Sequence, residues 1–170
     1  TAYEIGVRLV GSEMCIRDRY KESEINNQKK INVVKKYNFG RAHLVVAIPD
    51  PWIDVQTIAD LEEIAFEFRE KKKKRLRVAT KYPNLTREFL FSKGVTQFRL
   101  VDSLGATEAY PFTGSAELIA DISSTGETLK ANNLRVLKDG EILKSQACIF
   151  TSKKNLKKKG LKNLINLLSK

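Results

Sequence analysis

Residues 75–101 read RLRVATKYPNLTREFLFSKGVTQFRLV, and this stretch decides the fold class. Residues 75–80 are rich in apolar and β-branched side chains and predict a strand, and residues 97–101 predict another. Between them, residues 84–93 read as a helix that Gly94 closes, since glycine is favoured just beyond a helix end. The order strand, helix, strand is typical of a parallel pair joined by a crossover helix.

The same alternation continues on both sides of this stretch. Upstream, residues 42–48 predict a buried strand, and residues 57–69 predict an amphipathic helix that Thr57 caps, with Asp60 three residues on. Downstream, the chain predicts a turn at residues 138–141 and five further elements: a helix at 106–110, a strand at 116–122, a helix at 128–132, a strand at 145–150 and a helix at 156–168. The chain is therefore expected to be α/β with a parallel sheet.

The composition excludes several classes of protein. With 42% hydrophobic residues among 170, the chain is not a wholly disordered one. Its longest apolar stretches, such as residues 44–48, fall far short of the ~20 residues that a membrane-spanning helix needs. Cys15 and Cys148 have neither a disulfide framework nor zinc-site spacing. We therefore expect no membrane partner and a reducing cytoplasm as the compartment.

The formal net charge of +11 arises from two basic runs, residues 71–77 and residues 151–170. One interpretation is contact with a nucleic-acid backbone, since clustered Lys and Arg bind phosphates. Neither run has interleaved aromatic side chains that would stack on bases. We therefore expect solvated surfaces and no nucleic-acid partner, with a basic nucleic-acid-binding domain as an open alternative.

The stretch of residues 119–129, IADISSTGETL, predicts a strand, a loop and the start of a helix. Asp121 lies at the carboxyl end of the strand, where it can accept hydrogen bonds from ribose hydroxyls. The hydroxyls and backbone N–H groups of the loop suit a phosphate, and Gly126 allows a close approach or a positive φ. The alternative is an ordinary turn in which Asp121 makes a structural hydrogen bond.

Two blocks of this sequence resemble the ATP phosphoribosyltransferase family. The family signature E-x5-G-x-[SAG]-x2-[IV]-x-D-[LIV]-x2-[ST]-G-x-T-[LM] is matched at every position from Glu108 to Leu129. Residues 76–87, LRVATKYPNLTR, resemble the strand and the turn T-x-Y-P-N-L-T-R of the same family. The resemblance covers roughly residues 20–160.

The resemblance implies the first step of histidine biosynthesis, in which N1 of ATP attacks C1 of phosphoribosyl pyrophosphate and displaces pyrophosphate, with Mg²⁺ as cofactor. It implies that Asp121 meets the ribose, whereas the 5′-phosphate is bound by the loop residues Ser124, Thr125, Gly126, Glu127 and Thr128. The nucleotide or the pyrophosphate is assigned to Lys81, Tyr82, Asn84, Arg87 and Glu108. No catalytic side chain and no metal ligand is assigned, because such sites work by positioning and charge stabilisation.

The family's architecture implies two periplasmic-binding-protein-like lobes, here with the first lobe incomplete. Residues 48–147 form the expected second lobe, and residues 1–47 with 148–170 the remnant of the first. Residues 1–19 resemble read-through of a sequencing adapter, so we expect an N-terminally truncated protein with weak or no turnover. The resemblance favours the short form of the enzyme, a homo-oligomer that pairs with a regulatory subunit similar to a histidyl-tRNA synthetase. A truncated long form is the alternative to the short form. A non-catalytic two-lobed solute-binding module is the alternative to the enzyme.

Overall fold

The computed structural model describes residues 20–153, 160 and 163, so residues 1–19 and most of the expected helix at 156–168 lie outside the description. The chain divides into two compact units, unit 1 with Thr1–Arg41 and Gln146–Lys170, and unit 2 with Ala42–Ser145. Unit 2 begins before the expected boundary at residue 48 and ends before residue 147, and the assignment of the units to two lobes stays a prediction. No helix among the described residues is long and apolar enough to cross a membrane.

Unit 1 contains the short helix α2 (Ile25–Gln28) and an antiparallel pair of strands, β1 (Ile31–Lys36) and β7 (Cys148–Ser152). The prediction of one strand over residues 145–150 is wrong, because Ser145 ends an earlier strand and β7 starts at Cys148. Ala147, between them, accepts a hydrogen bond from the backbone N–H of Tyr37 at 2.8 Å and donates one to Phe39 at 3.0 Å. The chain passes from one sheet to the other at this point.

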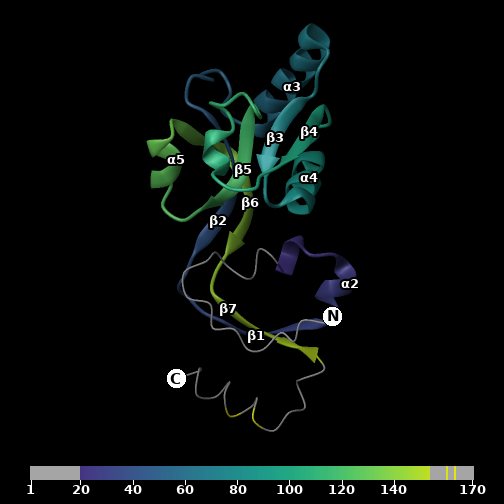
Figure 1. The fold of residues 1–170 in the computed structure, drawn as a ribbon, viewed down its shortest axis with the longest axis vertical. Helices are drawn as coiled ribbons and strands as arrows, with labels where there is room; N and C mark the ends of the chain where they lie inside the picture. Colours follow the sequence, from purple (N-terminus) through teal and green to yellow (C-terminus); the bar gives the residue numbers. More distant parts are fainter. Residues whose placement is uncertain (1–19, 154–159, 161–162, 164–170) are drawn as a thin grey trace. The chain divides into compact units, whose positions relative to one another are not determined.

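Unit 2 is built on a five-stranded sheet with the order β4-β3-β5-β2-β6 (Figure 1). Its strands are β2 (Ala42–Pro49), β3 (Leu76–Thr80), β4 (Phe98–Asp102), β5 (Leu118–Ser123) and β6 (Leu134–Ser145). β3 runs parallel to β4 and β5, as the alternation predicts. The prediction of a parallel sheet is wrong for β2, which is antiparallel to both β5 and β6. β2 is buried on both faces, as a central parallel strand is, so its composition does not reveal its direction.

The predicted turn at residues 138–141 is also wrong, since β6 continues through it to Ser145. Gly140 is buried in the strand, and a Cβ there would lie 2.9 Å from Leu137 Cβ and 3.1 Å from the Val46 carbonyl oxygen. The register between β2 and β6 shifts near Val45, which marks a bulge. Glycine is therefore needed at residue 140 because another backbone approaches closely at a bulge, and not because the chain reverses there.

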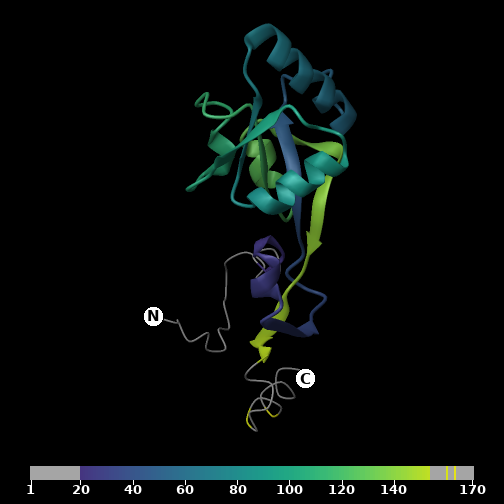
Figure 2. The same cartoon turned by 90° about the vertical axis from the view of Figure 1, so that its right-hand side faces the viewer.

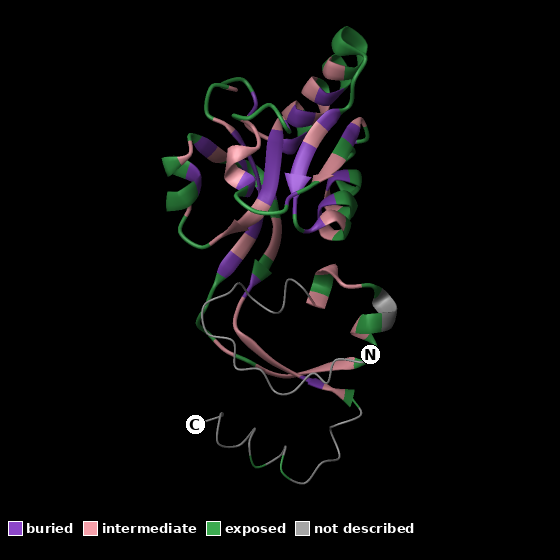
Figure 3. Ribbon diagram, in the orientation of Figure 1, coloured by how far each residue is buried: buried purple, intermediate pink, exposed green. Residues whose placement is uncertain are grey.

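Helices cover both faces of the sheet, and alternate residues of each strand supply the two halves of the core (Figures 1 and 2). Val46, Val78 and Leu118 belong to one cluster, with the helices α3 (Ile58–Lys72) and α4 (Pro83–Ser92). Val45, Ala79 and Ile119 belong to the other, with Leu129 of the short helix α5 (Glu127–Ala131). Buried residues accordingly follow the strands of unit 2 in Figure 3.

Helix α3 begins where the sequence predicts it to begin. The Thr57 hydroxyl accepts from the Asp60 backbone N–H at 3.4 Å, and Asp60 Oδ2 accepts from the Thr57 N–H at 2.8 Å. This reciprocal capping box satisfies two N–H groups that a helix start leaves unpaired. The helix ends at Lys72, and the C-cap residue Lys73 has a left-handed φ of 51°. The predicted solvated run is confirmed for residues 71–75, all of which are exposed, whereas Arg77 makes an ion pair with Glu117.

Candidate functional site

Three turns of unit 2 lie at one edge of the sheet because the strands that precede them are parallel. Thr80 of β3 lies opposite Asp102 of β4 and Ala120 of β5. The chain leaves these strands at the same edge, which we call the carboxyl edge (Figure 1). It carries the turns at residues 81–82, 103–107 and 124–126. Ligands of open α/β sheets bind at this edge.

The turn between β5 and α5 has the conformation that its glycine permits. Gly126 has φ 81° and ψ −5° and caps α5, whose first turn follows at once. No heavy atom lies within 4 Å of the position that a Cβ would take, so the positive φ, and not crowding by the protein, requires glycine. The side chains of Ser124, Thr125, Glu127 and Thr128 are exposed, and the Thr125 hydroxyl accepts from the Glu127 N–H at 3.4 Å.

Asp121 lies next to this turn, near the end of β5, and is half-buried. It pairs with Val45 of β2, which places it on the face of the sheet that α5 covers. Its Oδ1 accepts from the Ile122 backbone N–H at 2.8 Å. This bond fixes the carboxylate, and no bond within the described part of the chain uses Oδ2. The carboxylate therefore has an acceptor that a ligand can use.

The turn after β3 holds the second group of predicted residues. Lys81, Asn84 and Arg87 are exposed, and Asn84 Oδ1 accepts from Arg87 Nη1 at 3.5 Å. Tyr82 is buried, with 4% of its surface exposed, and caps α4, so its role as a ligand contact stays a prediction.

Two buried threonines, Thr80 and Thr86, shape this turn and were not singled out by sequence reasoning. Their hydroxyls lie 3.3 Å apart, and Thr80 Oγ1 accepts from the Tyr82 N–H at 3.0 Å. The signal that was available is a pair of threonines six positions apart, one at the end of β3 and one in the first turn of α4.

The turn after β4 is also fixed by residues that sequence reasoning missed. Ser103 and Thr107 are buried, and their hydroxyls lie 2.8 Å apart. Ser103 Oγ also donates to the Gly105 carbonyl at 2.9 Å, and its backbone N–H donates to the Thr80 carbonyl at 3.1 Å. Glu108 follows in a 3₁₀ turn, η1 (Thr107–Ala109), and is half-buried. A serine and a threonine around a glycine after a strand were the available signal.

The carboxyl edge thus brings together hydroxyls, backbone N–H groups, the basic side chains of Lys81 and Arg87, and the carboxylates of Asp102, Glu108, Asp121 and Glu127. Such a set suits a sugar that bears phosphate, because hydroxyls and N–H groups donate to phosphate and a carboxylate accepts from sugar hydroxyls. Within the described ranges, no three His, Cys, Asp or Glu side chains are grouped so that they could hold a metal ion. The edge therefore offers contacts to a ligand and no dedicated metal cage.

A family model described as HisG, ATP phosphoribosyltransferase, matches residues 7–170. This chain belongs to that family. An ATP phosphoribosyltransferase of Nitrobacter winogradskyi is 51% identical to it over 136 residues, which cover 80% of this chain and 42% of that protein. The chain thus spans less than half the length of this curated relative.

Solved structures agree with the family assignment and with the fold class. The ATP phosphoribosyl transferase (HisG:HisZ) complex from Thermotoga maritima matches with a TM-score of 0.64 and 25% identity, covering 89% of this chain and 63% of that chain. Holo ArgBP from T. maritima matches with a TM-score of 0.54 and 17% identity, covering 86% of this chain and 58% of that chain, and this likeness concerns the fold alone. The expected α/β class of periplasmic-binding-protein type is confirmed.

Proposed function

We propose that this chain carries the phosphoribosyl-pyrophosphate site of an ATP phosphoribosyltransferase. In this reaction N1 of the ATP adenine forms a bond to C1 of the ribose, the bond from C1 to the pyrophosphate oxygen breaks, and its electron pair leaves with pyrophosphate. The product is phosphoribosyl-ATP, the first intermediate of histidine biosynthesis. Membership of the family supports the proposal.

The observation that carries the proposal is the turn between β5 and α5 at the carboxyl edge. A solute-binding module also binds ligands with an α/β lobe, but it does not need a glycine-capped turn with four exposed polar side chains beside a fixed carboxylate. This turn suits a phosphate and the neighbouring carboxylate suits the ribose. The enzyme is therefore favoured over the non-catalytic alternative.

Each group at the edge has a distinct role in this proposal. Asp121 accepts hydrogen bonds from the ribose hydroxyls, through the oxygen that the Ile122 N–H leaves free. The 5′-phosphate is bound by the loop residues Ser124, Thr125, Gly126, Glu127 and Thr128. The nucleotide or the leaving pyrophosphate is bound by Lys81, Tyr82, Asn84, Arg87 and Glu108. These groups position the two substrates and stabilise charge on the leaving group, and none of them forms a covalent bond to substrate.

Mg²⁺ fits this arrangement as a companion of the substrate. Mg²⁺ in nucleotide sites is usually held by one or two carboxylates together with phosphate oxygens and waters. Asp121, Glu108 and Glu127 are the carboxylates among the predicted site residues at this edge, and no three acidic side chains of the described residues are grouped so that they could hold the ion by themselves. When bound, Mg²⁺ would neutralise charge on the pyrophosphate.

The complex of the T. maritima neighbour suggests a partner for this chain. We propose that it assembles, as a homo-oligomer, with a HisZ-like regulatory subunit that is similar to a histidyl-tRNA synthetase. Size measurement of the chain alone and mixed with such a subunit tests this point, and separate elution of the two would contradict it.

Asp121→Asn tests the proposed ribose contact. Asparagine keeps an oxygen for the Ile122 N–H, so the turn should keep its shape, but the charge that strengthens bonds from ribose hydroxyls is lost. A charge-assisted bond contributes roughly 1.5–3 kcal/mol, so the affinity for phosphoribosyl pyrophosphate should fall about tenfold or more. Isothermal calorimetry measures it, and ultraviolet detection of phosphoribosyl-ATP measures turnover.

Asp102→Asn is the matched control, because Asp102 is exposed at the end of the parallel strand β4 and has no assigned role. It removes the same charge from the same edge and should not weaken binding. Equal losses in both variants, or wild-type affinity in Asp121→Asn, would refute the assignment of Asp121 to the ribose.

A further inference from the structure

Unit 2 has a pocket at the edge of the sheet opposite the β5–α5 turn. Its volume is about 540 Å³, within the range of sites for small molecules, and it lies among α3, the loop after β2 and the loop before β5. Arg77, near the start of β3, and Glu117, just before β5, line it. Because β3 and β5 are parallel, this amino-edge pocket lies at the other end of the strands from the proposed phosphoribosyl-pyrophosphate site.

One wall of the pocket, the loop of residues 49–55, is held by bonds from outside it. Arg135 of β6 donates from Nη2 to the carbonyl oxygens of Trp52 and Val55, at 2.6 Å for Val55. Within the loop, the Trp52 N–H donates to the Pro49 carbonyl at 3.1 Å. The wall is therefore formed before a ligand arrives, which lowers the ordering cost of binding.

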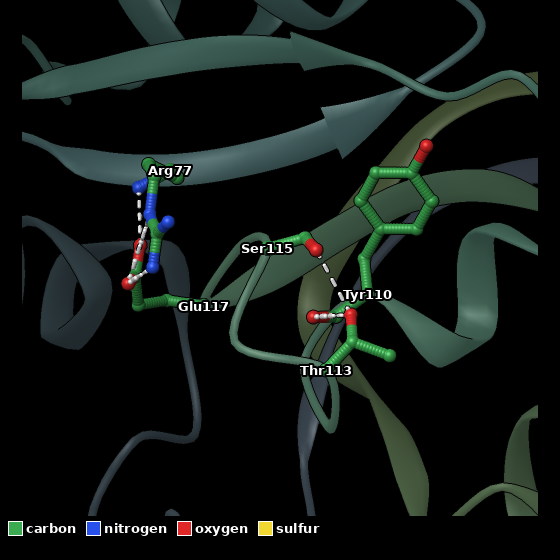
Figure 4. Close-up of polar contacts among 5 residues, drawn as sticks. All are labelled: Arg77, Tyr110, Thr113, Ser115 and Glu117. Atoms are coloured by element: carbon green, nitrogen blue, oxygen red, sulfur yellow. Dashed lines mark hydrogen bonds and ion pairs between the residues drawn. The ribbon is translucent and has the colours of Figure 1, made fainter.

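The opposite wall, the loop of residues 110–116, folds back on the Tyr110 carbonyl oxygen. This oxygen accepts from the Thr113 hydroxyl at 3.2 Å (Figure 4). It also accepts from the Ser115 backbone N–H at 3.1 Å. The hydroxyls of Thr113 and Ser115 also lie 3.0 Å apart. The second wall is thus as fixed as the first.

The walls offer flat apolar surface to a ligand. Trp52, Ile64 and Phe68 line the pocket and pack partly against the core beneath it, and Pro111 adds to the wall. Lys72 Nζ lies 3.7 Å over the centre of the Phe68 ring and covers that face, so Trp52, Ile64 and Pro111 supply the open apolar surface. An aromatic ring is the ligand group that such a set of aromatic and proline side chains accommodates.

The pocket lining balances three acids with three cations, Lys71, Lys72 and Arg77, and Arg77 is the cation that can receive an anion on that ring. Of three acids in the lining, Glu67 pairs with Lys71 at 2.7 Å, Glu117 pairs with Arg77 at 2.6 Å, and Asp54 is exposed at the rim. Glu117 accepts from Nε and Nη2 of Arg77 and also from its backbone N–H at 2.7 Å (Figure 4). The side-chain hydrogen bonds to Glu117 raise the pKa of Arg77 further, and an arginine guanidinium is charged at any ordinary pH.

The guanidinium of Arg77 has one nitrogen, Nη1, that can still donate hydrogen bonds to a ligand. Within the described part of the chain no group accepts from its Nη1, and the side chain is 36% exposed. An arginine that one carboxylate holds in place can present its remaining N–H groups to a second carboxylate with little loss of freedom.

We propose that the amino-edge pocket binds a small aromatic carboxylate, with the ring against Trp52 and the carboxylate at Nη1 of Arg77. The proposal is independent of the function assigned to the carboxyl edge, because the two sites share no residue.

Trp52 provides the readout, since it is the only tryptophan in the chain. Titration of the 170-residue protein with 4-fluorophenylacetate should change tryptophan fluorescence and shift the ligand's ¹⁹F resonance, with the millimolar affinity expected of so small a ligand. The affinity for the uncharged isostere 4-fluorophenylacetamide should be lower than that for the acid by about tenfold or more, because the amide cannot make the charge-assisted bond to Arg77. Absence of saturable change with the acid, or equal binding of the amide, would overturn the proposal.

Variants at two neighbouring arginines locate the site. Arg77 lies opposite Arg99 in the parallel pair β3–β4, and Arg99 is exposed and does not line the pocket. Arg77→Gln should weaken binding of the acid about tenfold and leave binding of the amide unchanged, whereas Arg99→Gln should change neither. Since Arg77→Gln leaves Glu117 without its partner, the double variant Arg77→Gln/Glu117→Gln is measured beside it. Retained acid binding in the folded double variant, or equal losses in Arg77→Gln and Arg99→Gln, would refute the role of Arg77.

Discussion

Replacing Gly126 with alanine should separate backbone strain from ligand contact at the β5–α5 turn. Gly126 has φ 81°, and a Cβ there would meet no protein atom within 4 Å. The substitution therefore adds strain without a clash in the free protein, and the new methyl group occupies space beside the N–H groups that are proposed to cradle the phosphate. Gly94, in the loop after α4, has φ 88° and equally open surroundings, so Gly94→Ala is a matched control.

The magnitude follows from the left-handed backbone. An L-residue with a Cβ in this region costs roughly 1–2 kcal/mol, so both variants should lose about that much of their free energy of unfolding. For a unit of this size such a loss lowers the melting temperature by about 4–8 °C per kcal/mol. Only Gly126→Ala should also lose affinity for phosphoribosyl pyrophosphate, by about tenfold or more, since about 1.4 kcal/mol of lost contact is enough.

Two measurements on each variant decide the matter: urea denaturation gives the free energy of unfolding, and calorimetry gives the affinity for phosphoribosyl pyrophosphate. The reasoning fails if Gly126→Ala binds like the wild type, because the backbone at residue 126 would then not face the phosphate. It also fails if both variants lose affinity equally, because strain alone would then explain the loss.

Three further predictions concern acidity, packing and surface charge. Hydrogen bonds from two backbone N–H groups lower the pKa of Asp60. Its contribution to stability is therefore present above its ordinary pKa and is lost as the pH falls through the lowered value. In urea denaturation between about pH 5 and pH 2, the free energy of unfolding should fall less steeply with decreasing pH for Asp60→Asn than for the wild type. Gly140→Ala should cost about 1–3 kcal/mol in urea denaturation, because its Cβ would lie 2.9 Å from Leu137 Cβ, whereas Gly105→Ala, which meets nothing within 4 Å, should cost far less. Changing residues 71–74 to glutamine should leave calorimetric affinity for phosphoribosyl pyrophosphate unchanged, since these lysines are exposed and exposed charges contribute under ~1 kcal/mol each; a large loss would place the run in the site.

Local sequence patterns predicted the helices and most strands of unit 2, because each pattern reflects a local cause, whereas strand β6 was not predicted. The capping box of α3 depends on Thr57 and Asp60 alone, and its geometry is as expected. Helix α4 and strand β4, expected at 84–93 and 97–101, are shifted by only one residue at either end. Such boundaries depend on side chains within a turn or two of the element.

The direction of β2 was not predictable in this way. A strand buried on both faces has the same composition whether its neighbours run parallel or antiparallel. The pairing of β2 with β6 depends on residues about a hundred positions apart, such as His43 and Lys144. The turn expected around Gly140 was wrong for a related reason. This glycine is required by the nearby Val46 carbonyl, which belongs to the distant strand β2.

The candidate site was predictable as far as its signature extends. The residues from Asp121 to Thr128 were found because they match a family pattern, and the structure adds the φ of Gly126 and the bond that fixes Asp121. The hydroxyl pair of Ser103 and Thr107 was missed, because buried hydroxyls are recognisable only when their partners are known. The amino-edge pocket was missed for the same reason, as its walls come from three separate loops and helices.

The first and last residues of unit 2 are neighbours, since Ala42 pairs with Ser145 at one end of the β2–β6 ladder. Every strand of the five-stranded sheet lies between them in one continuous segment. A short linker from residue 145 to residue 42 would therefore close the segment into a ring without breaking a strand pair. New ends opened at the exposed residues 104–105 would then give a circular permutant, and the same adjacency makes residues 42–145 a cassette that can be inserted into a surface loop of another protein.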